Sequence, residues 1–179
     1  MQLIKIPKDR IGVLIGIDGK IKEEIEEKSG INIDVDSESG DVKLDVKDEA
    51  EPVMVLKVAD IVNAIAVGFS PERAFRLFGE EIYFTYFDIR NYVGKDPKHV
   101  RRIRARIIGT EGKTRRIIED LSGADISIHR NYIGVIGDLI ELDVAKNAVD
   151  MVLNGSEHSS VYRYLENKRR EFKRQRMGF

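Results

Sequence analysis

Two short loops of this chain carry two glycines, an acid and a following lysine in the same order. The first is Gly16-Ile17-Asp18-Gly19-Lys20 and the second is Gly109-Thr110-Glu111-Gly112-Lys113. Two glycines let a backbone approach a phosphate without a Cβ in the way. Free N–H groups at the start of the following helix favour an anion. The chemistry predicted for both loops is therefore the binding of phosphate groups.

The two loops belong to a longer internal repeat with an offset of 93 residues. Residues 14–35 and 107–128 share nine identities over 22 positions without a gap. In each copy an apolar helix precedes the loop, a second helix follows it, and alternating apolar residues indicate a strand. A β-rich segment opens each copy, and a further strand and a helix around 52–67 or 141–153 close it. The repeat predicts one β-α-α-β-β-α unit, present twice.

An apolar pair before Gly-x-x-Gly, placed between two helices, is typical of a KH module, whose loop clamps about four nucleotides of single-stranded backbone. A lone Gly-x-x-Gly is usually a plain turn, but here it occurs twice in one frame. The predicted fold class is α+β, with two tandem type I KH modules joined by a short helical connector and packed together. The expected boundaries are 1–68 for the first module, 69–80 for the connector, 81–155 for the second module and 156–179 for a basic C-terminal helix.

The helix that closes the first copy is almost wholly apolar from Val53 to Val67. A helix of this composition is expected to be buried on all sides.

Charge is divided unevenly between the two halves of the chain. Residues 1–96 hold 13 Lys/Arg against 20 Asp/Glu, and residues 97–179 hold 17 against 11. This asymmetry favours a polyanion as the partner of the second half. The alternative is that these charges form ordinary solvated faces.

The second module is the stronger RNA-binding candidate because basic residues gather around its loop. Eight basic residues and one acid lie between Lys98 and Arg116. Arg102 and Arg106 are one helical turn apart and share a face. The predicted RNA-binding residues are Arg102, Arg106, Ile108, Gly109, Thr110, Glu111, Gly112, Lys113, Arg116, Ile126, His129 and Arg130.

The first module carries an acid-rich second helix, so its loop is predicted to be a weaker site for RNA or a docking site for protein. The residues of this secondary site are Gly16, Ile17, Asp18, Gly19 and Lys20. The segment Arg163–Phe179 holds seven basic residues and is expected to be a phosphate-contacting arm, with a disordered solubilising tail as the alternative.

Several functional classes are disfavoured by the composition. There is no cysteine, so disulfides and thiolate metal sites are excluded. The three histidines are scattered, and we expect neither a metal nor a cofactor. A phosphate-binding P-loop needs a glycine where Ile107 stands. With no paired acids or nucleophile motif, the chain is not expected to be an enzyme. No stretch looks like a signal peptide or a membrane span, which favours the cytoplasm.

The whole chain resembles a family of archaeal and eukaryotic KH-domain pre-ribosomal RNA-processing proteins, the partners of the rRNA 3′-end endonuclease. The most specific segments are FSPERAFRLF at 69–78 and RIIGTEGKTRRIIEDLSG at 106–123, and the basic C-terminal end also fits. The resemblance implies binding near the 3′ end of small-subunit rRNA. It also implies association with that endonuclease, with the rRNA dimethylating enzyme and with the α subunit of translation initiation factor two.

The predicted function is that of an assembly factor of the small ribosomal subunit that grips single-stranded rRNA mainly with the second module. Two alternatives stay open at this point. One is a protein-docking scaffold with a KH fold and incidental RNA binding. The other is an rRNA-cleaving enzyme, which requires a divalent metal site that the sequence does not suggest.

Overall fold

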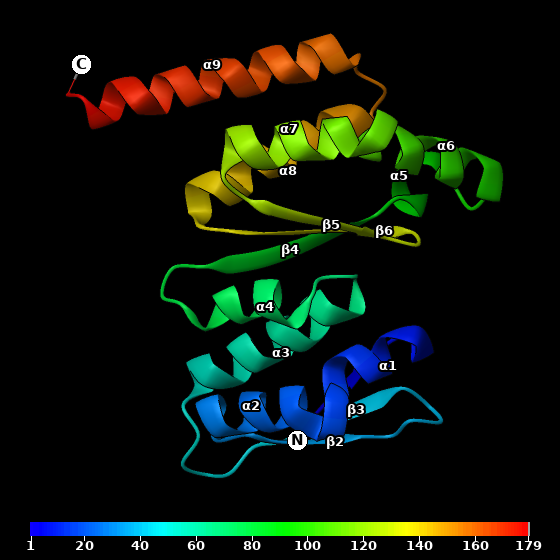
Figure 1. The fold of residues 1–179 in the computed structure, drawn as a ribbon, viewed down its shortest axis with the longest axis vertical. Coiled ribbons are helices and arrows are strands. Elements are labelled where there is room, and N and C mark those ends of the chain that lie inside the picture. Colours follow the sequence, from blue (N-terminus) through cyan, green and yellow to red (C-terminus); the bar gives the residue numbers. More distant parts are fainter. Residues whose placement is uncertain (179) are drawn as a thin grey trace. The chain divides into compact units, whose positions relative to one another are not determined.

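The computed structural model describes residues 1–178 and divides into two compact units, Met1–Glu80 and a second that begins at Glu81 (Figure 1). Each unit contains a three-stranded antiparallel sheet and a set of helices. Strands and helices alternate in the predicted order β-α-α-β-β-α in both units, with short additional helices. The α+β fold class with two KH modules is thereby confirmed.

The first unit has its sheet in the order β1-β3-β2. Pairing places Ile4 opposite Val42 and Ile33 opposite Leu44, and these apolar side chains are buried on the face that the helices cover. Its elements are β1 (Gln2–Lys5), α1 (Lys8–Ile15), the 3₁₀ turn η1 (Ile17–Gly19), α2 (Lys20–Ser29), β2 (Asn32–Val35), β3 (Asp41–Asp45), α3 (Pro52–Ala66), α4 (Pro71–Ala74) and the 3₁₀ turn η2 (Phe75–Phe78).

The second unit repeats this plan with the strand order β4-β6-β5, so β5 is an edge strand. Helices α6, α7 and α8 lie together over one face of the sheet (Figure 1). A short helix between the first strand and the first long helix was not predicted. The elements are β4 (Tyr83–Asp88), α5 (Arg90–Val93), α6 (Pro97–Ile108), the 3₁₀ turn η3 (Thr110–Gly112), α7 (Lys113–Ser122), β5 (Asp125–His129), β6 (Tyr132–Gly137) and α8 (Leu139–Leu153).

A last helix, α9 (His158–Arg176), packs against α7 and α8. Its side chains Val161 and Leu165 are fully buried in the core of the second unit, and Phe172 packs against that core. The alternative of a disordered tail is therefore wrong up to Arg176, because the apolar stripe of this helix has a surface to cover. Phe179, the last residue of the predicted arm, lies outside the described residues.

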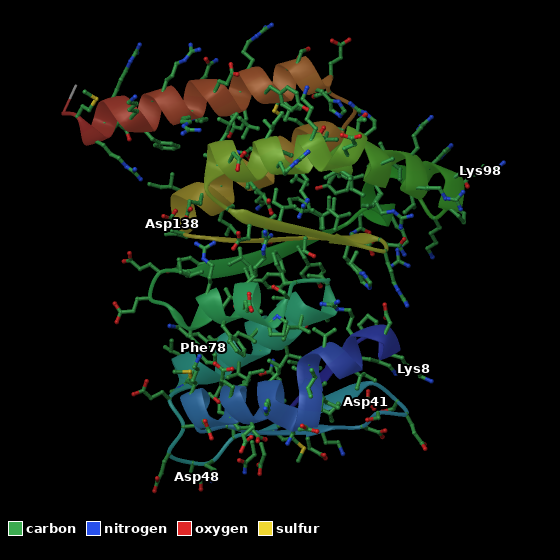
Figure 2. The ribbon with its side chains drawn as sticks, in the orientation of Figure 1. Lys8, Asp41, Asp48, Phe78, Lys98 and Asp138 are labelled. Atoms are coloured by element: carbon green, nitrogen blue, oxygen red, sulfur yellow. The ribbon has the colours of Figure 1, made fainter. Side chains whose placement is uncertain are left out.

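Two sequence predictions about the closing helices need correction. The helix α3 is not buried on all sides, because Val53 and Leu56 in its first two turns are more than 60% exposed. The helix α8 begins at Leu139, two residues before the predicted 141. Its start is set by a capping box, in which Asp138 and Glu141 each accept a hydrogen bond from the other's backbone N–H. Asp138 is labelled at this helix start in Figure 2.

No helix within residues 1–178 combines the length and the apolar composition that crossing a membrane requires.

The packing of α9 can be tested by removing one buried side chain. Leu165→Ala is expected to lower the free energy of unfolding by about 2–5 kcal/mol, because it deletes a fully buried leucine and leaves a cavity. The neighbouring exposed residue provides the control, and Glu166→Ala is expected to change stability by less than about 0.5 kcal/mol. Denaturant titration of both variants gives the comparison, and equal stabilities would contradict the assignment of α9 to the core.

Candidate nucleic-acid interface

The two Gly-x-x-Gly loops have the same backbone conformation. Gly109 has φ 74° and ψ 171°, and Gly16 has φ 76° and ψ 175°. The acid at the third loop position is left-handed in both copies, with φ 54° at Glu111 and at Asp18. The loop backbones therefore do not distinguish the two modules, and any functional difference between them arises from side chains.

The first glycine of the second loop is required by a close approach to the next helix. A Cβ on Gly109 would lie 2.6 Å from the backbone nitrogen of Thr114 and 2.8 Å from its Cβ. The last glycine is different, since nothing lies within 4 Å of the Cβ position of Gly112. Gly112 has φ 74° and ψ 15°, a left-handed conformation that asparagine also adopts. The first glycine allows contact between α6 and α7, and the second only allows the turn.

The amides of the loop glycines are not bare, contrary to the simplest expectation for a phosphate clamp. The N–H of Gly109 donates to the carbonyl of Ala105 at 2.8 Å, and the N–H of Gly112 donates to the carbonyl of Gly109 at 3.1 Å. Both bonds shape the turn. A phosphate at this loop would therefore depend on close access to the backbone and on the cations around it more than on these two glycine N–H groups.

Helix α9 supports the loop from behind. Thr114 is 2% exposed, and its hydroxyl shares a 3.0 Å hydrogen bond with the hydroxyl of Tyr162. His158 stacks on Tyr162 and donates from Nε2 to the carbonyl of Arg106 at 2.9 Å. That carbonyl lies in the last turn of α6, where the helix itself offers few donors. Residues of α9 thus hold both helices that flank the loop.

The predicted basic residues do not form one uniform patch. The guanidinium of Arg106 donates to the carbonyls of Val152 and Ser156, so it holds the end of α8 and is not free for RNA as predicted. Arg116 donates to the carbonyl of Glu111 at 2.9 Å and so braces the loop, while its side chain remains exposed. Arg102 and Lys113 are exposed. Lys113 and Arg116 therefore flank the loop as the charge pattern predicts.

One residue that was predicted to contact RNA lies in the core instead. Ile126 is completely buried in the core of the second unit and cannot touch a ligand. Ile128, two residues further along the edge strand β5 and on the same face, is only half-buried. Sequence reasoning missed Ile128, although the period of two in a strand offers it as readily as Ile126. Ile108 is also half-buried, at the point where α6 meets the loop.

The turn between β5 and β6 is short. His129 ends β5 and pairs with Tyr132, so Arg130 and Asn131 alone form the turn. Arg130 is exposed and left-handed, with φ 53°, and its carbonyl accepts a 2.9 Å hydrogen bond from Arg104. Arg104, which the charge pattern did not single out, therefore ties α6 to this turn.

The loop of the first module is surrounded by fewer available cations. Arg10 donates to the carbonyls of Ile65 and Phe69 at the end of α3, and burial lowers the pKa of its guanidinium. Lys22 pairs with Glu26 at 3.2 Å. Ile17, Asp18 and Lys20 are exposed at the loop, and position 21 is Ile where the second module has Thr114. The weaker predicted site therefore has a similar backbone in a less cationic setting.

Among the described residues no group of three His, Asp or Glu side chains could hold a metal ion.

The fold and the paired loops define the class of this protein as a two-module KH protein. A family profile described as a KH domain matches residues 1–55, and a profile described as a eukaryotic-type KH domain (KH-domain type I) matches residues 83–170. The sequence-based assignment of KH modules is confirmed.

Individual relatives narrow the class to a family. A KH domain-containing protein of Methanocaldococcus jannaschii is 39% identical, covering 98% of this chain and 77% of the relative. The pre-rRNA-processing protein pno1 of Schizosaccharomyces pombe is 28% identical over 93% of this chain and 70% of its own length. A chain in the solved a/eIF2alpha–aDim2p–rRNA complex of Pyrococcus horikoshii is 44% identical, with a TM-score of 0.88, covering 95% of this chain and 94% of that one. The chain belongs to the PNO1/Dim2 family of KH-domain proteins.

The different roles of the two loop glycines lead to a stability test. Gly109→Ala is expected to lower the free energy of unfolding by at least about 1–2 kcal/mol, because a Cβ there adds left-handed strain and collides with the backbone of Thr114. Gly112→Asn is expected to cost only a few tenths of a kcal/mol, because the site is open and asparagine tolerates the left-handed region. Thermal unfolding of both variants measures the difference, and a stable Gly109→Ala protein would refute the close approach.

Proposed function

We propose that this protein is an assembly factor of the small ribosomal subunit that binds single-stranded rRNA near the 3′ end of small-subunit rRNA, mainly through its second module. The observation that carries the proposal is the loop at 109–112, a KH turn with Lys113 and Arg116 exposed beside it. Support comes from the pre-rRNA-processing name of the fission-yeast relative and from the rRNA in the Pyrococcus complex.

The proposed RNA site extends from the loop across neighbouring exposed and half-buried residues. Backbone phosphates lie at the loop, where Arg102, Lys113 and Arg116 provide positive charge. Bases lie against the half-buried apolar side chains Ile108 and Ile128. The turn residues His129 and Arg130 form the opposite rim.

Protein partners are proposed from the relatives of this chain. The Pyrococcus complex contains the α subunit of a translation initiation factor with the matching chain, and we propose the same partner for this protein. Association with the rRNA 3′-end endonuclease and with the rRNA dimethylating enzyme is proposed from the resemblance in segments 69–78 and 106–123. The protein acts by binding, without a catalytic step of its own, in the cytoplasm.

Backbone electrostatics are expected to dominate the affinity of the loop, because its apolar neighbours are isoleucines and offer no aromatic surface for stacking. For a single strand, log K falls with log[salt] at a slope of about −0.7 for each phosphate neutralised. The loop with its surrounding cations is expected to give a clear negative slope in a salt titration.

A matched pair of substitutions tests which module grips RNA. Gly112→Asp and Gly19→Asp each add one carboxylate at a position where nothing lies within 4 Å. Gly112→Asp is expected to weaken binding of a single-stranded oligonucleotide from the 3′ end of small-subunit rRNA by about tenfold or more, because a like charge beside phosphate costs several kcal/mol. Gly19→Asp is expected to change it less than about threefold. Fluorescence anisotropy at fixed salt measures both, and the reverse order would assign the RNA to the first module.

The same variant separates the proposal from the protein-scaffold alternative. If the chain is a scaffold, the Gly112→Asp protein keeps its affinity for the initiation-factor α subunit and shows RNA binding no weaker than that of the wild type.

The enzyme alternative is tested by incubating labelled precursor rRNA with the pure protein and Mg²⁺ or Mn²⁺. Cleavage in that mixture would overturn the assignment as a binding protein.

A further inference from the structure

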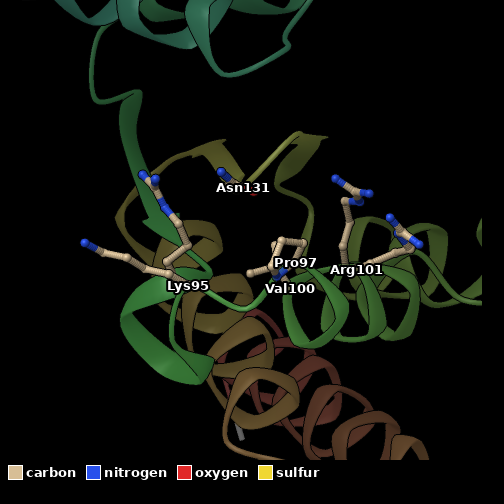
Figure 3. Close-up of a pocket in the computed structure, with 7 residues that line it drawn as sticks. Lys95, Pro97, Val100, Arg101 and Asn131 are labelled. Atoms are coloured by element: carbon tan, nitrogen blue, oxygen red, sulfur yellow. The ribbon is translucent and has the colours of Figure 1, made fainter.

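A cationic pocket lies at the opposite end of α6 from the Gly-x-x-Gly loop. It has a volume of about 280 Å³, and its charged walls are Arg90, Lys95, Arg101 and Arg104. Figure 3 shows Pro97 and Val100 between Lys95 and Arg101, with Asn131 of the β5–β6 turn opposite them. No acid lines this pocket within the described part of the chain. The pocket extends along α6 from Pro97 to Arg104, and at 1.5 Å per residue these two lie about 18 Å and about 7.5 Å along the helix from Gly109.

The positive charge of this pocket is only partly neutralised. Arg90 forms a salt bridge with Asp88 at 2.7 Å, and its hydrogen bonds lower the pKa of that carboxyl, so this pair stays ionised and nearly cancels. Within residues 1–178 the guanidinium of Arg104 donates to a neutral carbonyl, that of Arg130, and forms no salt bridge. Lys95 and Arg101 are exposed. Asp96 is nearby in sequence, and its carboxylate accepts the N–H of Lys98 as the cap of α6. The charges of Lys95, Arg101 and Arg104 therefore remain available to a polyanion.

An aromatic surface adjoins the cationic pocket. Arg90 lies 5.9 Å from the centre of the Tyr132 ring, and the Tyr132 ring meets that of Tyr86 edge-on at 5.9 Å. Tyr86 is 53% exposed, and its partner across the strands is Gly134, which has no side chain to cover it. Together with Asp88, Asn91 and Tyr92, these tyrosines line a second shallow pocket.

Aromatic rings beside a cationic groove are the combination by which proteins hold single-stranded nucleic acid. Bases stack on the rings, and cations track the phosphates. An acidic protein segment would use the same cations, whereas a single strand also uses several ring faces in a row, and Tyr86 lies in a cluster with Phe84 and Tyr132. The juxtaposition of Tyr86 and Tyr132 with Lys95, Arg101 and Arg104 therefore favours RNA.

We propose that these residues form a second RNA-contact site, which holds the nucleotides that extend beyond the four gripped at the Gly-x-x-Gly loop. Phosphates enter the pocket between Lys95 and Arg101, and a base stacks on Tyr86. Arg104 joins the two sites, because it lines the pocket and is bonded to the turn that rims the loop site. This inference rests on the proposed function, since it requires that the chain bind single-stranded RNA.

The test compares two RNA lengths with charge-reversal variants of the full chain. The probes are a four-nucleotide and a twelve-nucleotide single strand from the 3′ end of small-subunit rRNA. The double variant Lys95→Glu/Arg101→Glu is expected to bind the long probe at least about tenfold more weakly, with the salt slope reduced by about 1.4, the share of two phosphates. Its affinity for the short probe is expected to stay within about twofold of wild type.

Two controls make the comparison specific. Lys43→Glu/Lys146→Glu makes the same change of net charge at exposed positions of β3 and α8, and is expected to bind both probes like the wild type. Tyr86→Ala is expected to weaken the long probe about fivefold or more through loss of stacking, whereas Tyr86→Phe keeps the ring and the affinity. Circular dichroism confirms that each variant is folded.

Three other binding results would each refute a different part of the proposal. If the pocket variant and the control variant bind the long probe equally, the second site is refuted and the loop site stands. If the pocket variant loses both probes equally, the pocket is part of the loop site and the inference is refuted. If the wild-type protein binds neither probe, the proposed RNA-binding function fails, and the inference fails with it.

Discussion

The close approach of the end of α6 to the start of α7 is the contact on which the second module depends. It exists because Gly109 has no Cβ, which leaves the backbone of Thr114 free to fill that space. The approach buries Thr114 and directs its hydroxyl toward Tyr162 of α9, and the same helix supplies His158 to the carbonyl of Arg106. The shape of the loop is thus maintained by a helix outside the repeated unit. A loop held in this way is preorganised, so less conformational freedom is lost when a ligand binds.

The two modules carry the same loop backbone in two different side-chain settings. Their loops agree in dihedral angles to within a few degrees, including the left-handed acid. They differ in what stands next to the loop. The first has Ile21 and Glu23 where the second has Thr114 and Arg116. The exposed lysine after the loop and an ion pair one turn further on, Lys22–Glu26 or Arg115–Glu119, are common to both. The charge around the loop therefore differs between the two modules while the turn geometry is the same.

Arginine has a structural as well as a binding role in this molecule. In each unit, an arginine of the first long helix donates to carbonyls at the end of the closing helix, Arg10 to α3 and Arg106 to α8. Ile65 and Val152 lie in the last turns of these helices, where each carbonyl also accepts a backbone N–H from the turn that follows, and Phe69 and Ser156 lie just beyond the helix ends. A planar guanidinium with several donors can bond two such carbonyls at once. The two arginines are not at equivalent positions of the repeat. Carbonyls at the end of the closing helix are thus bonded in both units, but by arginines from different positions of the first long helix.

Much of this protein follows from its sequence. The repeat, the glycine spacing and the alternation of apolar residues are local signals, and they predicted the β-α-α-β-β-α order, the paired loops and the KH assignment. The roles of individual cations and isoleucines are not local. Arg106 and Lys113 both read as free basic residues, but only contacts with the distant residues Val152 and Ser156 show that Arg106 is engaged. Ile126 and Ile128 are equivalent in pattern, and only their depth at the sheet edge separates core from surface. The Tyr86 surface and the pocket at Lys95 likewise required the fold, because Tyr132 and Asn131 reach them only when the strands and helices pack.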